Sequence, residues 1–153
     1  MTKIISRFKT VLAASCIPLG SAAAPLPAPC NVVDPPTLAA LALQDAVTTV
    51  EHKAVTATPH GFDMCTFTPR HGASVTLTVM VLELPAGTAP VKPACTDKIL
   101  DRIATADCSA VAQGRMVKVA LVSGAAGFAP LNAILRSHFE SMVNGTAQTR
   151  EPH

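Results

Sequence analysis

The stretch from Ala73 to Leu84 constrains the fold more than any other part of the chain. Its alternate positions are aliphatic, as in a strand with one buried face. These positions are Val75, Leu77, Val79 and Val81, with Thr76 and Thr78 between them. Beyond Thr78 the second face also becomes apolar, at Met80, Leu82 and Leu84. That face is therefore either covered by another element or exposed as a docking patch.

The first 24 residues have the pattern of a secretory signal. Three basic side chains precede an uncharged stretch that ends in Ser21 and three alanines, as in a signal peptide. Residues 25–29 form a Pro/Ala-rich lead. The segment from Leu12 to Cys16 supports an alternative, a lipoprotein attachment site with a lipid on Cys16. No later stretch reaches the roughly 20 apolar residues of a membrane span. We therefore expect an exported protein, periplasmic or secreted, with lipid anchoring through Cys16 as the alternative.

Four cysteines remain once the signal is removed: Cys30, Cys65, Cys95 and Cys108. An even number of cysteines in an exported chain indicates disulfides. We predict the pairs Cys30–Cys65 and Cys95–Cys108, because each pair brackets one expected helix. There is no Cys-x-x-Cys sequence, so neither a thioredoxin-like redox motif nor c-type haem attachment is supported.

The charge of the mature part argues against nucleic acid as a partner. Nine basic and ten acidic side chains follow the signal, and the chain has no Trp or Tyr. Binding to nucleic acid needs a basic face, and single strands also need aromatic side chains for base stacking.

Periodicity along the chain predicts an α+β fold. We expect helices at 36–46 and 96–105, the second with a buried stripe of Ile99, Leu100, Ile103 and Ala104. A third helix follows Gly127 and ends at Asn144. Strands are expected at 62–68, 73–84, 108–112 and 115–123, with extended chain at 47–58. The prediction is a single antiparallel β-sheet backed by two or three helices on one face, in one domain at 30–144. A polar tail at 145–153 follows.

Two short motifs resemble a known family. Pro29, Cys30, Asn31, Val32, Val33 and Asp34 precede the first helix, and Cys65, Thr66 and Phe67 open a strand. This is similar to a small, largely uncharacterised cell-envelope lipoprotein domain common in actinobacteria. The resemblance covers the first half of the mature chain. It implies an envelope location and no established chemistry.

Candidate catalytic and metal-binding residues are few. His60, Met64 and His71 surround the strand at 62–68, and imidazole with thioether suits copper. However, both histidines adjoin glycines in expected turns, and methionines commonly fill core gaps. His138 lies on the apolar face of the last helix, where one ring nitrogen is usually satisfied within the protein. Ser123 lacks the Gly-x-Ser-x-Gly elbow of a hydrolase. We therefore assign no catalytic residue, no enzyme activity and no cofactor.

The function expected from these observations is binding or a structural role in the cell envelope. The second face of the sheet supplies a candidate patch made of Met80, Leu82, Ala120 and Val122. It would dock another envelope protein, a peptide or a lipid chain. One alternative is a periplasmic copper-binding accessory protein. Another is a secreted enzyme inhibitor that uses the proline-rich segment at 85–93.

Overall fold

The computed structural model describes residues 28–54, 61–72 and 74–148. The expected signal, Cys16, most of the lead, His60 and the last five residues lie outside these ranges. Of the predicted polar tail, residues 145–148 are described, and they belong to the last helix rather than to a tail.

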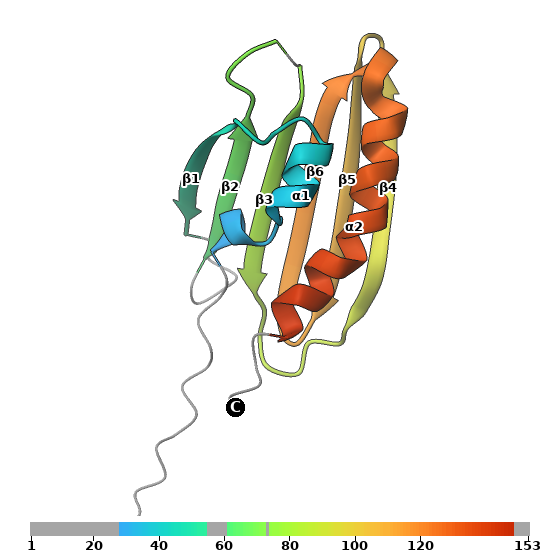
Figure 1. Ribbon diagram of the computed structural model, residues 1–153. Coiled ribbons are helices and arrows are strands. Elements are labelled where there is room, and N and C mark those ends of the chain that lie inside the picture. The colour runs from blue at the N-terminus through green and yellow to red at the C-terminus, as the bar shows by residue number, and fades with distance from the viewer. Residues whose placement is uncertain (1–27, 55–60, 73, 149–153) are drawn as a thin grey trace, which may run out of the picture.

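The fold is one antiparallel sheet of six strands (Figure 1). The strands are β1 (Val47–Lys53), β2 (Phe62–Thr68), β3 (Thr76–Glu83), β4 (Val91–Leu100), β5 (Ile103–Ala112) and β6 (Arg115–Gly124). Their order across the sheet is β1-β2-β3-β6-β5-β4. Two three-strand meanders therefore meet at the central pair, β3 and β6. The segment between β3 and β4 crosses the end of the sheet and covers neither face.

All the helices of the described residues lie on one face of the sheet (Figure 1). The short 3₁₀ helix η1 (Pro29–Asn31) and α1 (Pro35–Ala40) occupy the β2–β3 side, and α2 (Phe128–Gln148) packs against β4, β5 and β6. A second 3₁₀ turn, η2 (Ala125–Gly127), leads into α2. The first helix is shorter than predicted. The last continues past Asn144, so the predicted end there is wrong; the chain supplies no proline at that point to stop a helix.

The hydrophobic core lies between these helices and the sheet. Alternate strand residues point into it, as the sequence predicted for β3 and β6. One row across the sheet, read from the strand register, shows this arrangement: Cys65 pairs with Val79, Val79 with Val119, and Val119 with Cys108. All four side chains are fully buried. From the helix side, α2 contributes Leu135, Phe139 and Met142 to this core.

The predicted helix at 96–105 is wrong, because these residues form the β4–β5 hairpin. Leu100 pairs with Ile103, and the turn residue Asp101 has a positive φ of 54°. Asp tolerates this left-handed conformation better than most side chains, which allows a tight reversal here. Ala104 is buried as expected, whereas Ile99, Leu100 and Ile103 are exposed. The helix expected at 96–105 is therefore replaced by strands, and the fold has more sheet than predicted.

Both predicted disulfides are confirmed. Cys30 bonds to Cys65 and Cys95 bonds to Cys108. The reason given for the second pair is wrong, since Cys95 and Cys108 are direct cross-strand partners in the β4–β5 hairpin. The first bond has a different role, because it attaches η1 to the sheet at β2.

Candidate functional site: the open face of the sheet

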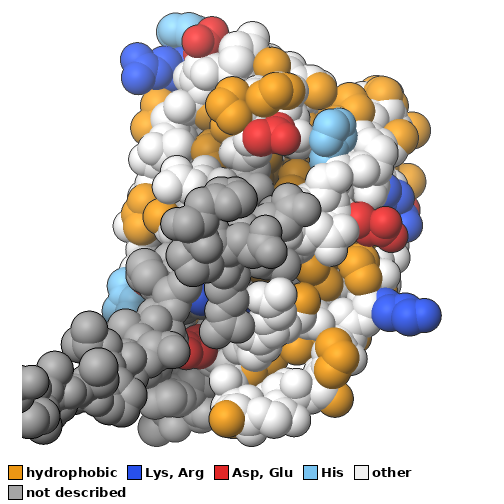
Figure 2. All heavy atoms as spheres, turned by 60° about the horizontal axis from the view of Figure 1, so that its bottom comes forward, with side chains coloured by type: hydrophobic (Ala, Val, Ile, Leu, Met, Phe, Trp, Pro, Cys, Tyr) orange, Lys and Arg blue, Asp and Glu red, His pale blue; other side chains and the backbone are white. Residues whose placement is uncertain are grey.

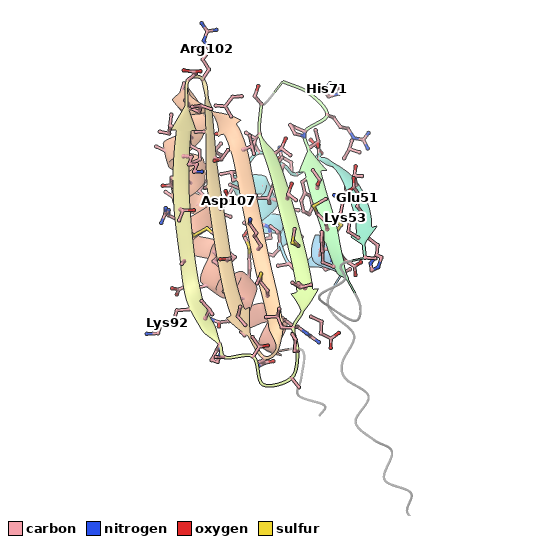
Figure 3. The ribbon with its side chains drawn as sticks, turned by 180° about the vertical axis from the view of Figure 1, so that it is seen from behind. Glu51, Lys53, His71, Lys92, Arg102 and Asp107 are labelled. Atoms are coloured by element: carbon pink, nitrogen blue, oxygen red, sulfur yellow. A yellow bond between two sulfur atoms is a disulfide. The ribbon has the colours of Figure 1, made fainter. Side chains whose placement is uncertain are left out.

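The face of the sheet opposite the helices, here called the open face, has no described helix against it, as the view from behind shows (Figure 3). The strand register divides this face into rows of side chains that cross the sheet. Apolar side chains occupy the two ends of the face, and polar side chains occupy its middle.

The first apolar area, here called the methionine band, lies at the end of the sheet near the β5–β6 turn. The register places Phe62 beside Leu82 and Leu82 beside Met116, while Met64 pairs with Met80 in the next row. All five side chains are half-buried. Because Met is flexible and polarisable, such a surface can adapt to differently shaped partners.

The second apolar area, here called the tip patch, lies at the other end of the face. It consists of Leu100, Ile103 and Val122, which are 77%, 57% and 38% exposed. The register connects them: Leu100 pairs with Ile103, and Thr105 lies between Val122 and Lys98. Exposed aliphatic side chains gathered in one area are a common feature of docking surfaces.

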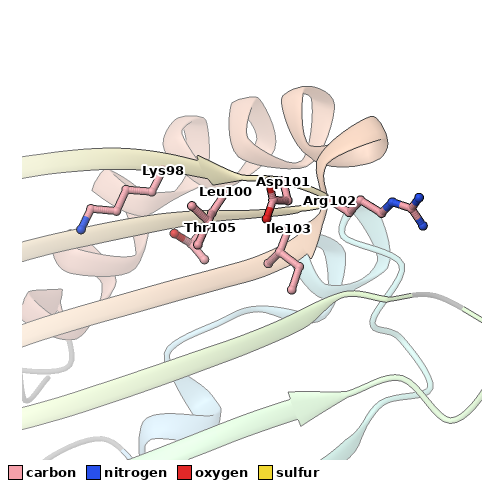
Figure 4. A pocket seen from close by; sticks show the side chains of 6 residues that line it. All are labelled: Lys98, Leu100, Asp101, Arg102, Ile103 and Thr105. Carbon is pink, nitrogen blue, oxygen red and sulfur yellow. The ribbon is translucent and has the colours of Figure 1, made fainter.

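A hollow of about 780 Å³ adjoins the tip patch (Figure 4). It is lined by Lys98, Leu100, Asp101, Arg102, Ile103 and Thr105. Arg102 extends away from the other lining side chains, past the end of the hairpin. The hollow thus combines two aliphatic side chains with a small number of polar groups, which is a common composition for a binding site.

Polar side chains separate the two apolar areas. The Thr66 and Thr78 hydroxyl groups lie 3.4 Å apart on neighbouring strands. On the other half of the face the Lys118 ammonium lies 3.7 Å from a carboxylate oxygen of Asp107. Both of these charged side chains are nearly half exposed, so their ion pair contributes little to stability.

The four residues of the predicted patch all belong to the open face and are spread along its length. Met80 and Leu82 lie in the methionine band, Val122 belongs to the tip patch, and Ala120 lies in the polar middle beside Thr78. The most exposed large apolar side chains of the face, Leu100 and Ile103, were not predicted, because their segment was expected to be a helix with these side chains buried.

The predicted copper ligands are not brought together in the described residues. Met64 is in the interior of β2 and pairs with Met80, whereas His71 follows the end of that strand, and His60 is outside the described residues. Within the described ranges there is no group of three or more His, Cys, Asp or Glu side chains able to hold a metal ion.

His138 contacts the N-terminal turn of α1. Its Nδ1 lies 3.1 Å from the hydroxyl of the buried Thr37. The Thr37 backbone N–H donates to the carboxylate of Asp34, the N-cap residue, at 2.7 Å. The pKa of Asp34 is lowered from its ordinary value of 3.8. The largest cause is the hydrogen bond from the Thr37 side chain, followed by the one from the Thr37 backbone N–H. Partial burial of the carboxylate opposes this shift, and the charge of His138 adds a smaller lowering. These contacts join α1 to α2, so His138 has a structural role at the contact between the two helices.

The capping role of Asp34 can be tested by two substitutions. Asp34→Ala is expected to lower the free energy of unfolding by about 1 kcal/mol, because the helix loses its N-cap acceptor. Asp34→Asn keeps an acceptor and should cost less. Since folding lowers the Asp34 pKa, the carboxylate stabilises the fold above pH 4, and this contribution is lost as the pH falls below that.

Urea denaturation at pH 7 and pH 3 measures both effects. The difference between wild type and Asp34→Asn should be smaller at pH 3 than at pH 7, because the stabilisation that comes from the lowered Asp34 pKa is lost as the pH falls. A difference that stays the same at both pH values would contradict this account of the Asp34 pKa.

Among the described residues visible in Figure 2, the Lys and Arg side chains lie apart from one another and form no basic patch at that end of the molecule. No helix in the described part of the chain combines the length and apolarity that crossing a membrane requires.

Comparison of the sequence with protein-family models and curated proteins, and of the fold with solved structures, gave no match.

Proposed function

We propose that this chain is an exported cell-envelope binding module that docks another polypeptide on the open face of its sheet, centred on the tip patch. The observation that carries the proposal is the exposure of Leu100 and Ile103, which pair with each other at the end of the β4–β5 hairpin. Buried at an interface, two aliphatic side chains of this size would supply a large part of a binding energy.

The rim of the tip patch fits a polypeptide better than a purely apolar ligand. Lys98, Asp101 and Arg102 border the hollow, so charges of both signs surround an apolar centre. This arrangement, an apolar core within a polar rim, is typical of protein interfaces. The two disulfides support an oxidising location outside the cytoplasm.

The hairpin offers a matched pair of substitutions to test the proposal. Leu100 faces the open side and Ile99 the helix side, and both are highly exposed, at 77% and 66%. Leu100→Asp should weaken partner binding at least tenfold, because it places a charge in the apolar centre. Ile99→Asp should leave binding unchanged. Neither substitution should alter the fold, because both side chains are in solvent.

The measurement begins with affinity capture from the envelope fraction of the source cells, with reversible cross-linking, using wild type and both variants. The affinity of each variant for the captured protein is then measured with purified components, and circular dichroism checks the fold. Equal affinity of wild type and Leu100→Asp would place the docking site elsewhere. Equal loss in both variants would assign binding to the hairpin as a whole and not to the open face.

A further inference from the structure

Three methionines of the methionine band lie on neighbouring strands of the open face. Met64 is on β2, Met80 on β3 and Met116 on β6. The other methionine that follows the expected signal, Met142, is 6% exposed in the core. Filling of core gaps, a common role of methionine, explains Met142 but not the three on the open face. Strand propensity does not explain them either, since it favours β-branched and aromatic side chains.

The register brings the three thioether groups within reach of one ion. Met64 and Met80 are direct cross-strand partners, and the Cβ atoms of such partners lie about 4.5–5.5 Å apart. Met116 pairs with Leu82 and is therefore the diagonal neighbour of Met80, at about 7–8 Å by the same rule. Methionine side chains are long and unbranched, so their sulfur atoms can move toward a common point. Met80 is the central member, with one further sulfur available on each side.

The donor type determines which ion fits this group. A thioether is a soft ligand and suits Cu(I), whereas Zn²⁺ in proteins is bound by thiolate, imidazole or carboxylate. Because three thioethers bring no negative charge, a monovalent ion costs less to desolvate here than a divalent one. The four described cysteines are all in disulfides. Among the described residues, methionine is therefore the soft donor that stays available in an oxidising compartment.

Two charged side chains lie in the same row as Met64 and bear on a bound cation. Glu51 of β1 is the direct partner of Met64, and its carboxylate is exposed, 3.8 Å from the Lys53 ammonium. At the other end of the row, the Lys118 ammonium lies 3.7 Å from Asp107 on the next strand. The lysine is thus partnered on the side away from the methionines, and the glutamate supplies a negative charge next to them.

We propose that Met64, Met80 and Met116 bind one Cu(I) ion through their three sulfur atoms. This set differs from the copper ligands predicted from the sequence, since it retains Met64 and uses neither His60 nor His71. The site lies at the opposite end of the open face from the tip patch. It is therefore independent of the proposed docking site, and either can fail without the other.

Titration of the exported chain with Cu(I) tests the site directly. Free thiols are first blocked with N-ethylmaleimide, so that the ion cannot bind to a cysteine. Competition with the chelator bicinchoninate in the absence of oxygen should give one Cu(I) per chain. Ag(I), a redox-stable probe of the same soft chemistry, should bind with the same stoichiometry. It should shift the ε-methyl NMR signals of Met64, Met80 and Met116 and leave that of Met142 unchanged, whereas Zn²⁺ should shift none of them.

Leucine substitutions separate metal binding from packing. Leucine keeps the apolar character and approximate volume of methionine and removes the sulfur. Met64→Leu, Met80→Leu and Met116→Leu should each weaken Cu(I) binding at least about tenfold, since even the loss of an outer-shell partner has this effect at metal sites. Met142→Leu is the matched control and should bind Cu(I) as the wild type does. Circular dichroism checks that each variant is folded.

Several results would overturn the proposal. One is a wild-type chain that takes up neither Cu(I) nor Ag(I), and another is equal weakening by Met142→Leu. Full affinity in any one of the three open-face variants would remove that methionine from the set and contradict the site as proposed. His71→Ala should bind Cu(I) as the wild type does. A loss of binding in that variant would place the ion at the turn after β2 and not on the open face.

Discussion

Replacing Cys30 and Cys65 together by alanine should lower the free energy of unfolding by about 4 kcal/mol, whereas replacing Cys95 and Cys108 should lower it by about 3 kcal/mol. The two bonds close segments of different length, with sequence separations of 35 and 13. The longer closure restricts the unfolded chain more, and the loop-entropy relation gives values of this size. Both substitutions leave no unpaired thiol.

The folded structure adds to this difference. The Cys30–Cys65 bond fixes η1 and the start of the helix layer to β2, and the buried Val32 and Val33 follow it directly. The Cys95–Cys108 bond joins two strands that already share a continuous register from Ala94 to Leu100. Without the first bond, the segment that leads into α1 has fewer constraints holding it on the sheet.

Urea denaturation followed by circular dichroism, with both double variants under the same conditions, measures the two losses. Proteolysis should also cut the segment before α1 faster in the Cys30→Ala/Cys65→Ala variant, while β4 remains protected. A larger loss from the Cys95→Ala/Cys108→Ala variant would contradict the assignment of the first bond as the main constraint.

The strands were predictable where the alternation was long. The boundaries of β2 agree with prediction, and β3 and β6 bury the expected faces. The β4–β5 hairpin was missed because aliphatic residues at 99, 100, 103 and 104 also fit a helical stripe. Whether such a short run forms a helix or a strand depends on the strands with which it can pair. Here β6 offers β5 an edge, and Asp101 can adopt the turn conformation that the hairpin needs.

The candidate site was predictable only in part, for the same reason. The open faces of β3 and β6 follow from alternation within each strand, which identified Met80, Leu82, Ala120 and Val122. The polar side chains of β3 and β6 then divide this face into the methionine band and the tip patch. The tip patch depends instead on the order of the strands, which brings Val122 close to the β4–β5 hairpin. Periodicity carries no information on that order.

Neighbouring residues on β6 test the open face most directly. Leu121 is fully buried beneath the helices, and Val122 points to the other side and is 38% exposed. Leu121→Ala should cost about 3 kcal/mol, because it removes buried methyl groups and leaves a cavity in a packed core. Val122→Ala should cost less than about 1 kcal/mol, because its side chain is already partly in solvent.

Aspartate substitutions should distinguish the buried face of β6 from its exposed face more strongly than alanine substitutions do. Leu121→Asp should prevent folding, since an unpaired carboxylate would be buried. Val122→Asp should fold, with a loss of stability smaller than that of Leu121→Ala, and should bind the partner more weakly. Thermal and urea denaturation of the four variants give the comparison. If Val122→Asp were as destabilising as Leu121→Ala, part of the chain would cover this end of the face in solution. The tip patch would then belong to the core, and the docking site would have to lie elsewhere.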